Sequence, residues 1–310
     1  MNFLYCFDEY YNTQAFVSIY SLLQNVNEKI NIFIIHKNKD LIFLPKVILS
    51  HKNLNILNTY EYKQSAFSFP NIEKAHVSEA TYYRFFIDQY LPRDIEILIY
   101  LDADIVCVSD PIVDLKNEMK ELKKSDFIIS ARLENESLNK KLKLKSSNYF
   151  NAGVMIINNK RWIEHDIGKK LIEITSERHE DLEFWDQDSL NILFDGDFLH
   201  MSKFLNFNLN MYPYEKVSNY ELDKNVKLIH YFGKFKPWSL KGIENEKTRY
   251  YQEFYRAIYK KKYHLKDNWK VNTIKDLFKI IFTGRIVKIK YPFSLIFLTF
   301  QFLIRNNKNV

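Results

Sequence analysis

Glycine is scarce in this sequence, with 6 residues in 310. No GxGxxG and no GxxxxGK[ST] pattern occurs. Such loops are rich in glycine because their backbone has to approach a bound pyrophosphate closely. A dinucleotide-binding fingerprint and a Walker A loop are therefore excluded. Hydrophobic residues make up 46% of the chain, so a large core is expected and disorder of the whole chain is not.

Cysteine and long apolar runs are also in short supply. Cys6 and Cys107 lie in or beside apolar runs, which predicts buried free thiols in a reducing compartment and no disulfide framework. The longest uncharged apolar run, residues 291–304, is shorter than the ~20 residues of a membrane-spanning helix. The first residues lack a basic region and meet an acid at Asp8, so we expect a strand there and not a signal peptide.

Negative charge is nearly absent from the end of the chain. Residues 260–310 hold 12 Lys and Arg against 2 Asp, a net charge of +10, whereas the whole chain carries +7. The rest of the protein is therefore slightly acidic. A nucleic-acid partner is not predicted, because the basic end carries bulky aliphatic residues and little arginine.

Short apolar runs alternate with segments of helical periodicity. Helices are expected after Asn12, which could cap the first one, from Ser78 to Leu91, and over residues 186–194. This alternation predicts the α/β class, with a single mixed, mostly parallel sheet flanked by helices. Ligands of such sheets bind beyond the carboxyl ends of the strands. Strands are expected at residues 2–7, 30–36, 54–57, 96–101, 126–130, 149–158 and 226–233.

The segment "YLDADIV", residues 100–106, sets Asp102 and Asp104 one residue apart after an apolar run. Three interpretations stay open. Asp is common in turns that follow strands. An apolar strand followed by Asp-x-Asp also opens phosphatases in which the first Asp is a nucleophile, although that motif normally lies near the start of a chain. Finally, two carboxylates can hold Mg²⁺ or Mn²⁺, and the cation removes their mutual repulsion.

The segment "HYFGKFKPW", residues 230–238, suggests where a further metal ligand comes from. His230 ends an apolar run. Gly233 allows the backbone to approach a ligand closely, and Lys236 offers a charge for phosphate. A histidine followed by these residues at fixed short spacing is a more specific sign of a metal ligand than a lone histidine at the end of a strand.

Five ordered segments resemble glycosyltransferase family 8, and within it the bacterial lipopolysaccharide galactosyl- and glucosyltransferases. The resemblance runs from the first strand to about Trp238. It implies the GT-A fold, a UDP-sugar donor, Mn²⁺ or Mg²⁺ as cofactor, and transfer with retention of anomeric configuration. The segments are "FDEYY" (7–11), "HVSEATYYR" (76–84), "YLDADIV" (100–106), "YFNAGVMIIN" (149–158) with "WDQDSLN" (185–191), and "HYFGKFKPW" (230–238).

The resemblance also implies roles for particular residues. Asp102, Asp104 and His230 would hold the metal. Asp8 would meet the uracil base and Tyr11 would stack on it. Gln187 and Asp186 would lie at the catalytic centre. The residues that it assigns to the nucleotide-sugar are Phe7, Asp8, Tyr11, Arg84, Asp102, Ala103 (ribose), Asp104, Asn151, Ala152, Asp186 and Gln187 (sugar pocket), with Gly233 and Lys236 (diphosphate).

Some of these residues have simpler explanations. Arg84 could pair with Asp88 on its own helix, Asn151 could be a turn residue, and Asp186 could cap the helix that it precedes.

Other positions match the family less well. The chain has Tyr10 where family members often have Asn, and the loop from residue 132 to residue 147 matches poorly. We expect this loop to shape the acceptor site, and His76 could lie on the same side.

The expected function is therefore that of a retaining hexosyltransferase, which moves galactose or glucose from a UDP-sugar to a lipopolysaccharide or lipooligosaccharide acceptor. No unpaired carboxylate stands out as a nucleophile, so we expect the acceptor hydroxyl to attack from the side of the leaving phosphate. Gln187 is the candidate on the opposite face of the sugar. The rival interpretations are a non-catalytic peripheral membrane protein that keeps the pocket, and the phosphotransferase discussed above.

Residues 268–305 mix lysine and arginine with isoleucine, phenylalanine and leucine. This composition predicts a segment that lies in a membrane interface rich in anionic lipid. We therefore expect a catalytic domain over residues 1–255 and a basic, membrane-associating helical extension over residues 256–310. The protein is expected in the cytoplasm, on the inner face of the bacterial inner membrane. The alternative is a helix that packs on the body with its lysines in solvent.

Overall fold

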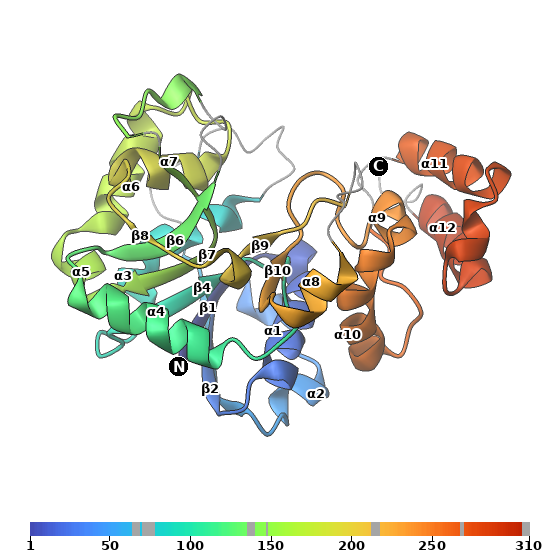
Figure 1. The fold of residues 1–310 in the computed structure, drawn as a ribbon, viewed down its shortest axis with the longest axis horizontal. Coiled ribbons are helices and arrows are strands. Elements are labelled where there is room, and N and C mark those ends of the chain that lie inside the picture. The colour runs from blue at the N-terminus through green and yellow to red at the C-terminus, as the bar shows by residue number, and fades with distance from the viewer. Residues whose placement is uncertain are drawn as a thin grey trace.

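A computed structural model gives the fold of the chain (Figure 1). It describes residues 1–63, 69, 78–134, 140–146, 148–211, 218–266 and 270–305. His76 and part of the loop between residues 132 and 147 therefore lie outside the described residues. The strands are β1 (Asn2–Phe7), β2 (Ile30–His36), β3 (Leu54–Glu61), β4 (Ile97–Leu101), β5 (Ile105–Cys107), β6 (Ile129–Glu134), β7 (Tyr149–Asn158), β8 (Leu199–His200), β9 (Phe207–Asn208) and β10 (Leu228–His230).

The α-helices lie between these strands and after the last of them. Short 3₁₀ helices precede several of them, among them η1 (Glu9–Tyr11) and η3 (Glu79–Phe86). The α-helices are α1 (Asn12–Asn25), α2 (Lys46–Leu49), α3 (Ile87–Tyr90), α4 (Ile112–Lys124), α5 (Asn159–Glu164), α6 (Ile167–Glu177), α7 (Trp185–Phe194), α8 (Asn219–Lys224), α9 (Leu240–Glu244), α10 (Arg249–Tyr259), α11 (Lys270–Phe282) and α12 (Pro292–Arg305).

The central sheet has the strand order β3-β2-β1-β4-β7-β6-β8. Strands β1, β2, β3 and β4 are parallel, whereas β7 is antiparallel to both β4 and β6. The sheet is thus mixed and mostly parallel, as the alternation of strands and helices predicts. Because β1 and β4 are parallel neighbours, Asp8 and Asp102 emerge at the same edge of the sheet.

Both faces of the sheet are buried, and successive residues of a strand enter different cores. Along β1, Leu4 and Cys6 pack with η3, α3, α5, α6 and α7. Phe3, Tyr5 and Phe7 pack with α1, α2 and α4 on the opposite face. This follows from the two-residue period of a strand. A strand covered on both sides has no polar face, which explains the unbroken apolar runs in the sequence.

A second sheet, which the sequence analysis does not predict, has the order β5-β10-β9. Strand β5 follows β4 after a tight turn and pairs antiparallel with β10. The late apolar run before His230 therefore belongs to this small sheet and not to the central one. The two cysteines are buried and free, as predicted.

Two local expectations are wrong in detail. The segment from Ser78 to Leu91 is a 3₁₀ helix followed by one turn of α-helix, although Ser78 does cap it by accepting from the amide of Ala80. Asn12 is the first residue of α1 and not its cap. Its side chain instead binds His36 and the backbone oxygen of Leu41.

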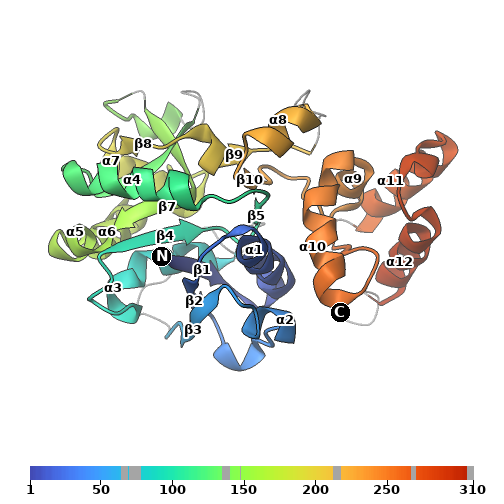
Figure 2. The same ribbon diagram turned by 60° about the horizontal axis from the view of Figure 1, so that its bottom comes forward.

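The C-terminal helices form one end of the molecule, far from α5 and α6 (Figures 1 and 2). Helix α10 packs on α1, where Phe254 meets Tyr20 edge to face. Helices α11 and α12 share an apolar cluster with α9 that includes Leu240, Leu277 and Leu295. The described helices include none with the length and apolarity that crossing a bilayer requires.

Candidate active site

A cavity of about 700 Å³ opens where β1 and β4 end. Every residue that the sequence analysis assigns to the metal or the nucleotide-sugar lines it. The structure thus brings together residues from six separate stretches of the chain, while their contacts with a donor stay predictions. These residues are Phe7, Asp8, Tyr11, Arg84, Asp102, Ala103, Asp104, Asn151, Ala152, Asp186, Gln187, His230, Gly233 and Lys236.

Asp102 and Asp104 lie on the turn that joins the two sheets. The amide of Ile105 donates to the backbone oxygen of Asp102, which closes the turn between β4 and β5. The amide of Asp102 donates to Gly153 on β7. The turn interpretation and the metal interpretation are therefore compatible, because the turn is what aims both carboxylates at the cavity.

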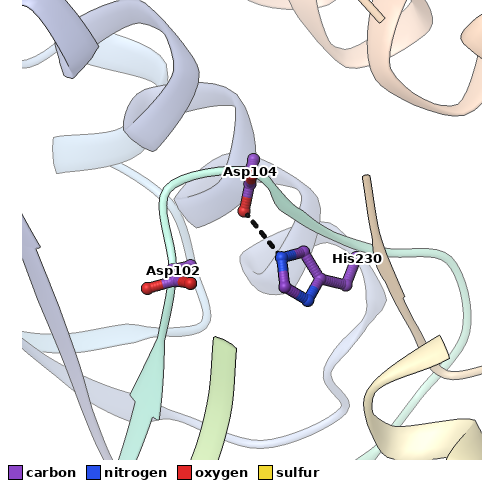
Figure 3. A group of neighbouring side chains, drawn as sticks. All are labelled: Asp102, Asp104 and His230. Atoms are coloured by element: carbon purple, nitrogen blue, oxygen red, sulfur yellow. Dashed lines mark ion pairs between the residues drawn. The ribbon is translucent and has the colours of Figure 1, made fainter. Parts of the chain in front are cut away.

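His230 reaches these carboxylates through the small sheet. In the antiparallel register of β10 and β5, His230 lies opposite Ile105, next to Asp104. One ligand atom from each of Asp102, Asp104 and His230 lies within 4.8 Å of the other two. Figure 3 shows the two carboxylates on the turn and the imidazole on a separate strand facing Asp104. The predicted convergence of the three side chains is confirmed.

The hydrogen bonds of His230 determine which ring nitrogen faces the cavity. Nδ1 lies 3.1 Å from the side-chain oxygens of Asn151 and Asn206, which are acceptors, so Nδ1 carries the proton. Nε2 is then left with a lone pair, 3.5 Å from Oδ1 of Asp104. Oδ1 of Asp104 is buried and has no hydrogen-bond donor among the described residues. Two lone pairs that face each other without a proton fit a cation between them.

The charges around the three residues favour the forms that bind a metal. Burial lowers the pKa of His230 despite the nearby carboxylate of Asp104, so the imidazole is neutral at pH 7. Burial opposes the ionisation of Asp104, but the charge and the hydrogen bond of Lys236 outweigh it and lower the pKa of this carboxyl. Nζ of Lys236 lies 2.7 Å from Oδ2 of Asp104. Oxygen and imidazole ligands of this kind suit Mn²⁺ and Mg²⁺.

Arg84 is buried and binds both acids that flank the cavity. It lies 2.7 Å from Asp186 and 3.3 Å from Asp102, and it donates to the backbone oxygen of Ala152. Burial raises the pKa of Asp186 to about 6, although Arg84 favours the ionised form. The pairing with Asp88 on the same helix is not observed, because Arg84 points into the site.

Gln187 is held at both ends of its amide. Its oxygen accepts from the amide of Ala152 at 3.0 Å, and its nitrogen donates to the hydroxyl of Tyr149 at 2.9 Å. That hydroxyl donates to Asp188, whose other oxygen accepts from the amides before α7. Asp188 is therefore structural, and Asp186 is not the helix cap. Gln187 is fixed in place on one wall of the cavity.

The base-binding and phosphate-binding candidates lie on tight turns. Asp8 caps η1 by accepting from the amide of Tyr10, and Tyr11 ends this helix. Gly233 has a φ of 81°, a left-handed conformation that favours glycine. The loop after β10 therefore needs a glycine at this position.

The sequence of the chain was compared with those of known families. A family described as "Glycosyl transferase family 8" matches residues 2–242. The chain belongs to glycosyltransferase family 8. The phosphotransferase interpretation of Asp102 and Asp104 is thereby set aside.

Relatives of this family 8 glycosyltransferase include enzymes of lipopolysaccharide synthesis. The lipopolysaccharide 1,2-glucosyltransferase of Escherichia coli is 30% identical over 255 residues, 74% of this chain and 71% of the relative. The lipopolysaccharide 1,3-galactosyltransferase of Salmonella typhimurium is 32% identical over 51% of this chain and 49% of the relative.

Solved structures show that the fold is GT-A. The galactosyltransferase LgtC, solved in complex with donor and acceptor sugar analogues, superposes with a TM-score of 0.67 at 20% identity. The superposition covers 84% of this chain and 96% of LgtC.

Two residues of this candidate site were missed by the sequence analysis. Asn206 is fully buried and binds both Asn151 and His230, so it helps to orient the imidazole. Lys266 lines the cavity although it follows α10, outside all five motifs. Asn151 lies within β7, so the turn interpretation of that residue is wrong. Its side-chain oxygen holds His230, a role that the sequence gives no sign of.

Proposed function

We propose that the chain transfers galactose or glucose from a UDP-sugar to a lipopolysaccharide-type glycan, with a divalent cation as cofactor and with retention of configuration. The observation that carries this proposal is the cluster of Asp102, Asp104 and His230 in the cavity, with a buried carboxylate oxygen that has no donor among the described residues. Membership of family 8 supports the glycosyl transfer. The relatives named for lipopolysaccharide glucosyl and galactosyl transfer support the sugar and the acceptor.

Asp102, Asp104 and His230 would hold the cation. Its chemistry when bound is the neutralisation of negative charge on the departing diphosphate. Lys236 adds a second positive charge at the same place, because its ammonium group already lies at Asp104 and can turn to a phosphate oxygen. Gly233 permits the close approach of the backbone to that group.

The other residues of the cavity favour attack from the side of the leaving group. A double displacement needs a free carboxylate on the opposite face of the sugar. Asp102 and Asp186 both bind Arg84, and Asp8 caps a helix. Gln187 is an amide, which is a poor nucleophile, and its hydrogen bonds hold it as a wall of the sugar site. The leaving phosphate is then the base for the acceptor hydroxyl.

The proposal extends to the membrane. The described parts of α11, α12 and the turn between them expose large apolar side chains beside lysines. A glycolipid acceptor resides at a membrane surface, so binding of these helices to the cytoplasmic leaflet would bring the cavity to the acceptor. The boundary near residue 255 remains part of this proposal.

The test is release of UDP from a panel of UDP-sugars, with Mn²⁺ or Mg²⁺ and with or without a truncated lipopolysaccharide acceptor. The wild-type chain is expected to turn over UDP-galactose or UDP-glucose, and Asp104→Ala is expected to lose at least 10²-fold of that activity while keeping its melting temperature within a few degrees. Asp110→Ala, a carboxylate outside the cavity, is the control. A wild-type chain that binds UDP without consuming any donor would favour the non-catalytic rival, and an active Asp104→Ala would refute the metal site.

A further inference from the structure

Lys266 enters the cavity from the C-terminal part of the chain, beyond the residues that match the family. Its Nζ donates to the backbone oxygen of Tyr10. Nζ also lies 5.8 Å from the ring centroid of Tyr10 and 5.4 Å from that of Tyr11. Lys266 is therefore beside η1, whose N-cap is Asp8.

The segment that carries Lys266 is built into the rest of the site. The amide of Lys266 donates to the backbone oxygen of Trp238 at 2.9 Å. Two residues earlier, the amide of His264 donates to the side-chain oxygen of Gln252 at 2.9 Å. The side-chain nitrogen of Gln252 donates to the backbone oxygens of His264 and Pro237. Lys266 is thus fixed to the loop that follows β10.

The ammonium of Lys266 lacks a carboxylate partner. No described carboxylate forms an ion pair with it, and its hydrogen bond goes to a neutral backbone oxygen. Burial lowers the pKa of Lys266, and the nearby charge of Asp8 opposes that effect. A partly buried cation that faces a cavity is stabilised by an acceptor atom of a ligand.

Asp8 and Lys266 offer a ligand opposite hydrogen-bonding groups. The carboxylate of Asp8 only accepts, and the ammonium of Lys266 only donates. One oxygen of Asp8 is taken by the amide of Tyr10, which leaves the other for a ligand. One edge of uracil presents an N–H donor beside a carbonyl acceptor, which complements this pair. Cytosine presents a ring-nitrogen acceptor beside an amino donor. Its ring nitrogen would therefore face Asp8, which is also an acceptor, and its amino group would face Lys266, which is also a donor.

We propose that Lys266 donates to the 4-carbonyl oxygen of a uracil base while Asp8 accepts from the adjacent ring N–H. The two residues together then select uridine over cytidine diphosphates. This inference rests on the proposed function, and it adds a residue of the C-terminal segment to the nucleotide site. Lys236, beside Asp104, would then contact the diphosphate of the nucleotide, and Lys266, beside η1, would contact its base.

The experiment is calorimetric titration of the full chain with UDP and with CDP, in the presence of Mn²⁺. The variants are Lys266→Met, which keeps the aliphatic length, and Lys266→Arg, which keeps a group that only donates. Lys261→Met removes an exposed lysine from the same loop and is the matched control. Melting temperatures confirm that each variant is folded.

The wild type is expected to bind UDP at least tenfold more tightly than CDP. Lys266→Met should weaken UDP binding about tenfold and CDP binding less than twofold, as expected for loss of a charged hydrogen bond. Lys266→Arg should keep most of the preference, and Lys261→Met all of it. Unchanged UDP affinity in Lys266→Met would overturn the inference, and so would an equal loss for both nucleotides, which indicates a phosphate contact. A wild-type chain that binds neither nucleotide would refute the proposed function itself.

Discussion

At the scale of single residues, the site depends on side chains shared between neighbours. Arg84 is bound by two carboxylates and covers the ring of Tyr100 at 4.0 Å. One guanidinium between two acids leaves an excess of negative charge, which burial makes unfavourable. A second cation next to Asp102 would remove this excess. The arrangement of Arg84 therefore agrees with a metal at the neighbouring cluster.

Gly153 shows a second constraint at this scale. A Cβ added there would lie 2.6 Å from Nδ1 of His230 and would also contact Cε1 of that ring. Real Cβ atoms essentially never show so short a contact. The glycine of the "NAG" segment is therefore required by the imidazole that packs on it, and not by its own backbone angle.

We predict that Gly153→Ala displaces His230 and lowers the affinity for Mn²⁺, in the presence of UDP, at least tenfold. The measurement is a titration of free Mn²⁺ by electron paramagnetic resonance. Gly284→Ala is the control: its φ of 69° makes the change cost about 1 kcal/mol of folding stability, but among the described residues only its chain neighbours have atoms within 4 Å of the added Cβ. Wild-type Mn²⁺ affinity in Gly153→Ala would exclude a metal-binding role for His230.

The sequence motifs predicted that Asp102, Asp104 and His230 would lie together, and the structure places one ligand atom of each within 4.8 Å of the other two. They did not predict Asn206 or Lys266. These residues reach the site through packing between segments far apart in the chain, and their neighbours in sequence carry no motif. Asn151 was placed at the site correctly, but its hydrogen bond to His230 depends on the register of the second sheet.

At the scale of elements, the small sheet brings His230 to Asp102 and Asp104. The turn after β4 takes the chain out of the central sheet, and β5 then pairs with β10. The apolar run of β10 looks like any buried strand, so the sequence could not show which sheet it joins. The run from Ser78 to Leu91 has the apolar spacing of a helix, yet tertiary packing winds most of it as 3₁₀ helix. In this form it directs Arg84 at the cavity.

The loop between α10 and α11 holds a histidine, His264, against aromatic side chains. His264 packs between the rings of Trp238 and Tyr255, and its Nδ1 lies 2.6 Å from the hydroxyl of Tyr251. Burial lowers the pKa of His264 to about 3, so the unfolded chain binds a proton between pH 6.5 and 3 that the folded chain does not. Folding stability is therefore lost as the pH falls through this window.

His264→Asn keeps an acceptor for Tyr251 and removes the titration. We expect the loss of unfolding free energy between pH 7 and pH 5 to be smaller in this variant than in the wild type, by up to about 2 kcal/mol. Urea denaturation at both pH values measures it. The same loss in both proteins would mean that His264 is protonated in the folded state.

At the scale of the whole molecule, the C-terminal helices present an apolar surface away from the central sheet. Phe293, Phe297 and Phe300 recur at helical spacing along α12, and the first two are 84% and 63% exposed. Phe282 of α11 is also exposed and stacks on Phe278. Such a group of phenylalanines beside lysines is typical of a surface that binds a membrane.

We predict that Phe293→Ser with Phe297→Ser weakens binding to vesicles of anionic lipid at least tenfold, because each phenylalanine loses apolar burial worth of order 1 kcal/mol. Cosedimentation at low and high salt measures it. Phe43→Ser is the matched control, since Phe43 is 77% exposed on the N-terminal part of the protein. If the wild-type protein does not bind anionic vesicles at low salt, the predicted membrane role of these helices is wrong.

The α/β class of the fold could be predicted from the sequence, because alternating apolar strands and periodic helices leave few other arrangements. The packing of the C-terminal helices on the rest of the protein could not be predicted. The boundary that we propose near residue 255 lies within α10, and this helix packs on α1. A change in charge along the sequence marks where solvent exposure changes, and a packed helix can cross such a point.

The residues that line the cavity extend in sequence from Cys6 to Lys266, so they come from most of the length of the polypeptide. During synthesis Asp102 and Asp104 leave the ribosome long before His230 and Lys266. A nascent chain can therefore fold much of its central sheet before the proposed donor site is complete. Premature release or proteolytic clipping ahead of residue 230 would yield a protein with both carboxylates of the cluster but without its imidazole.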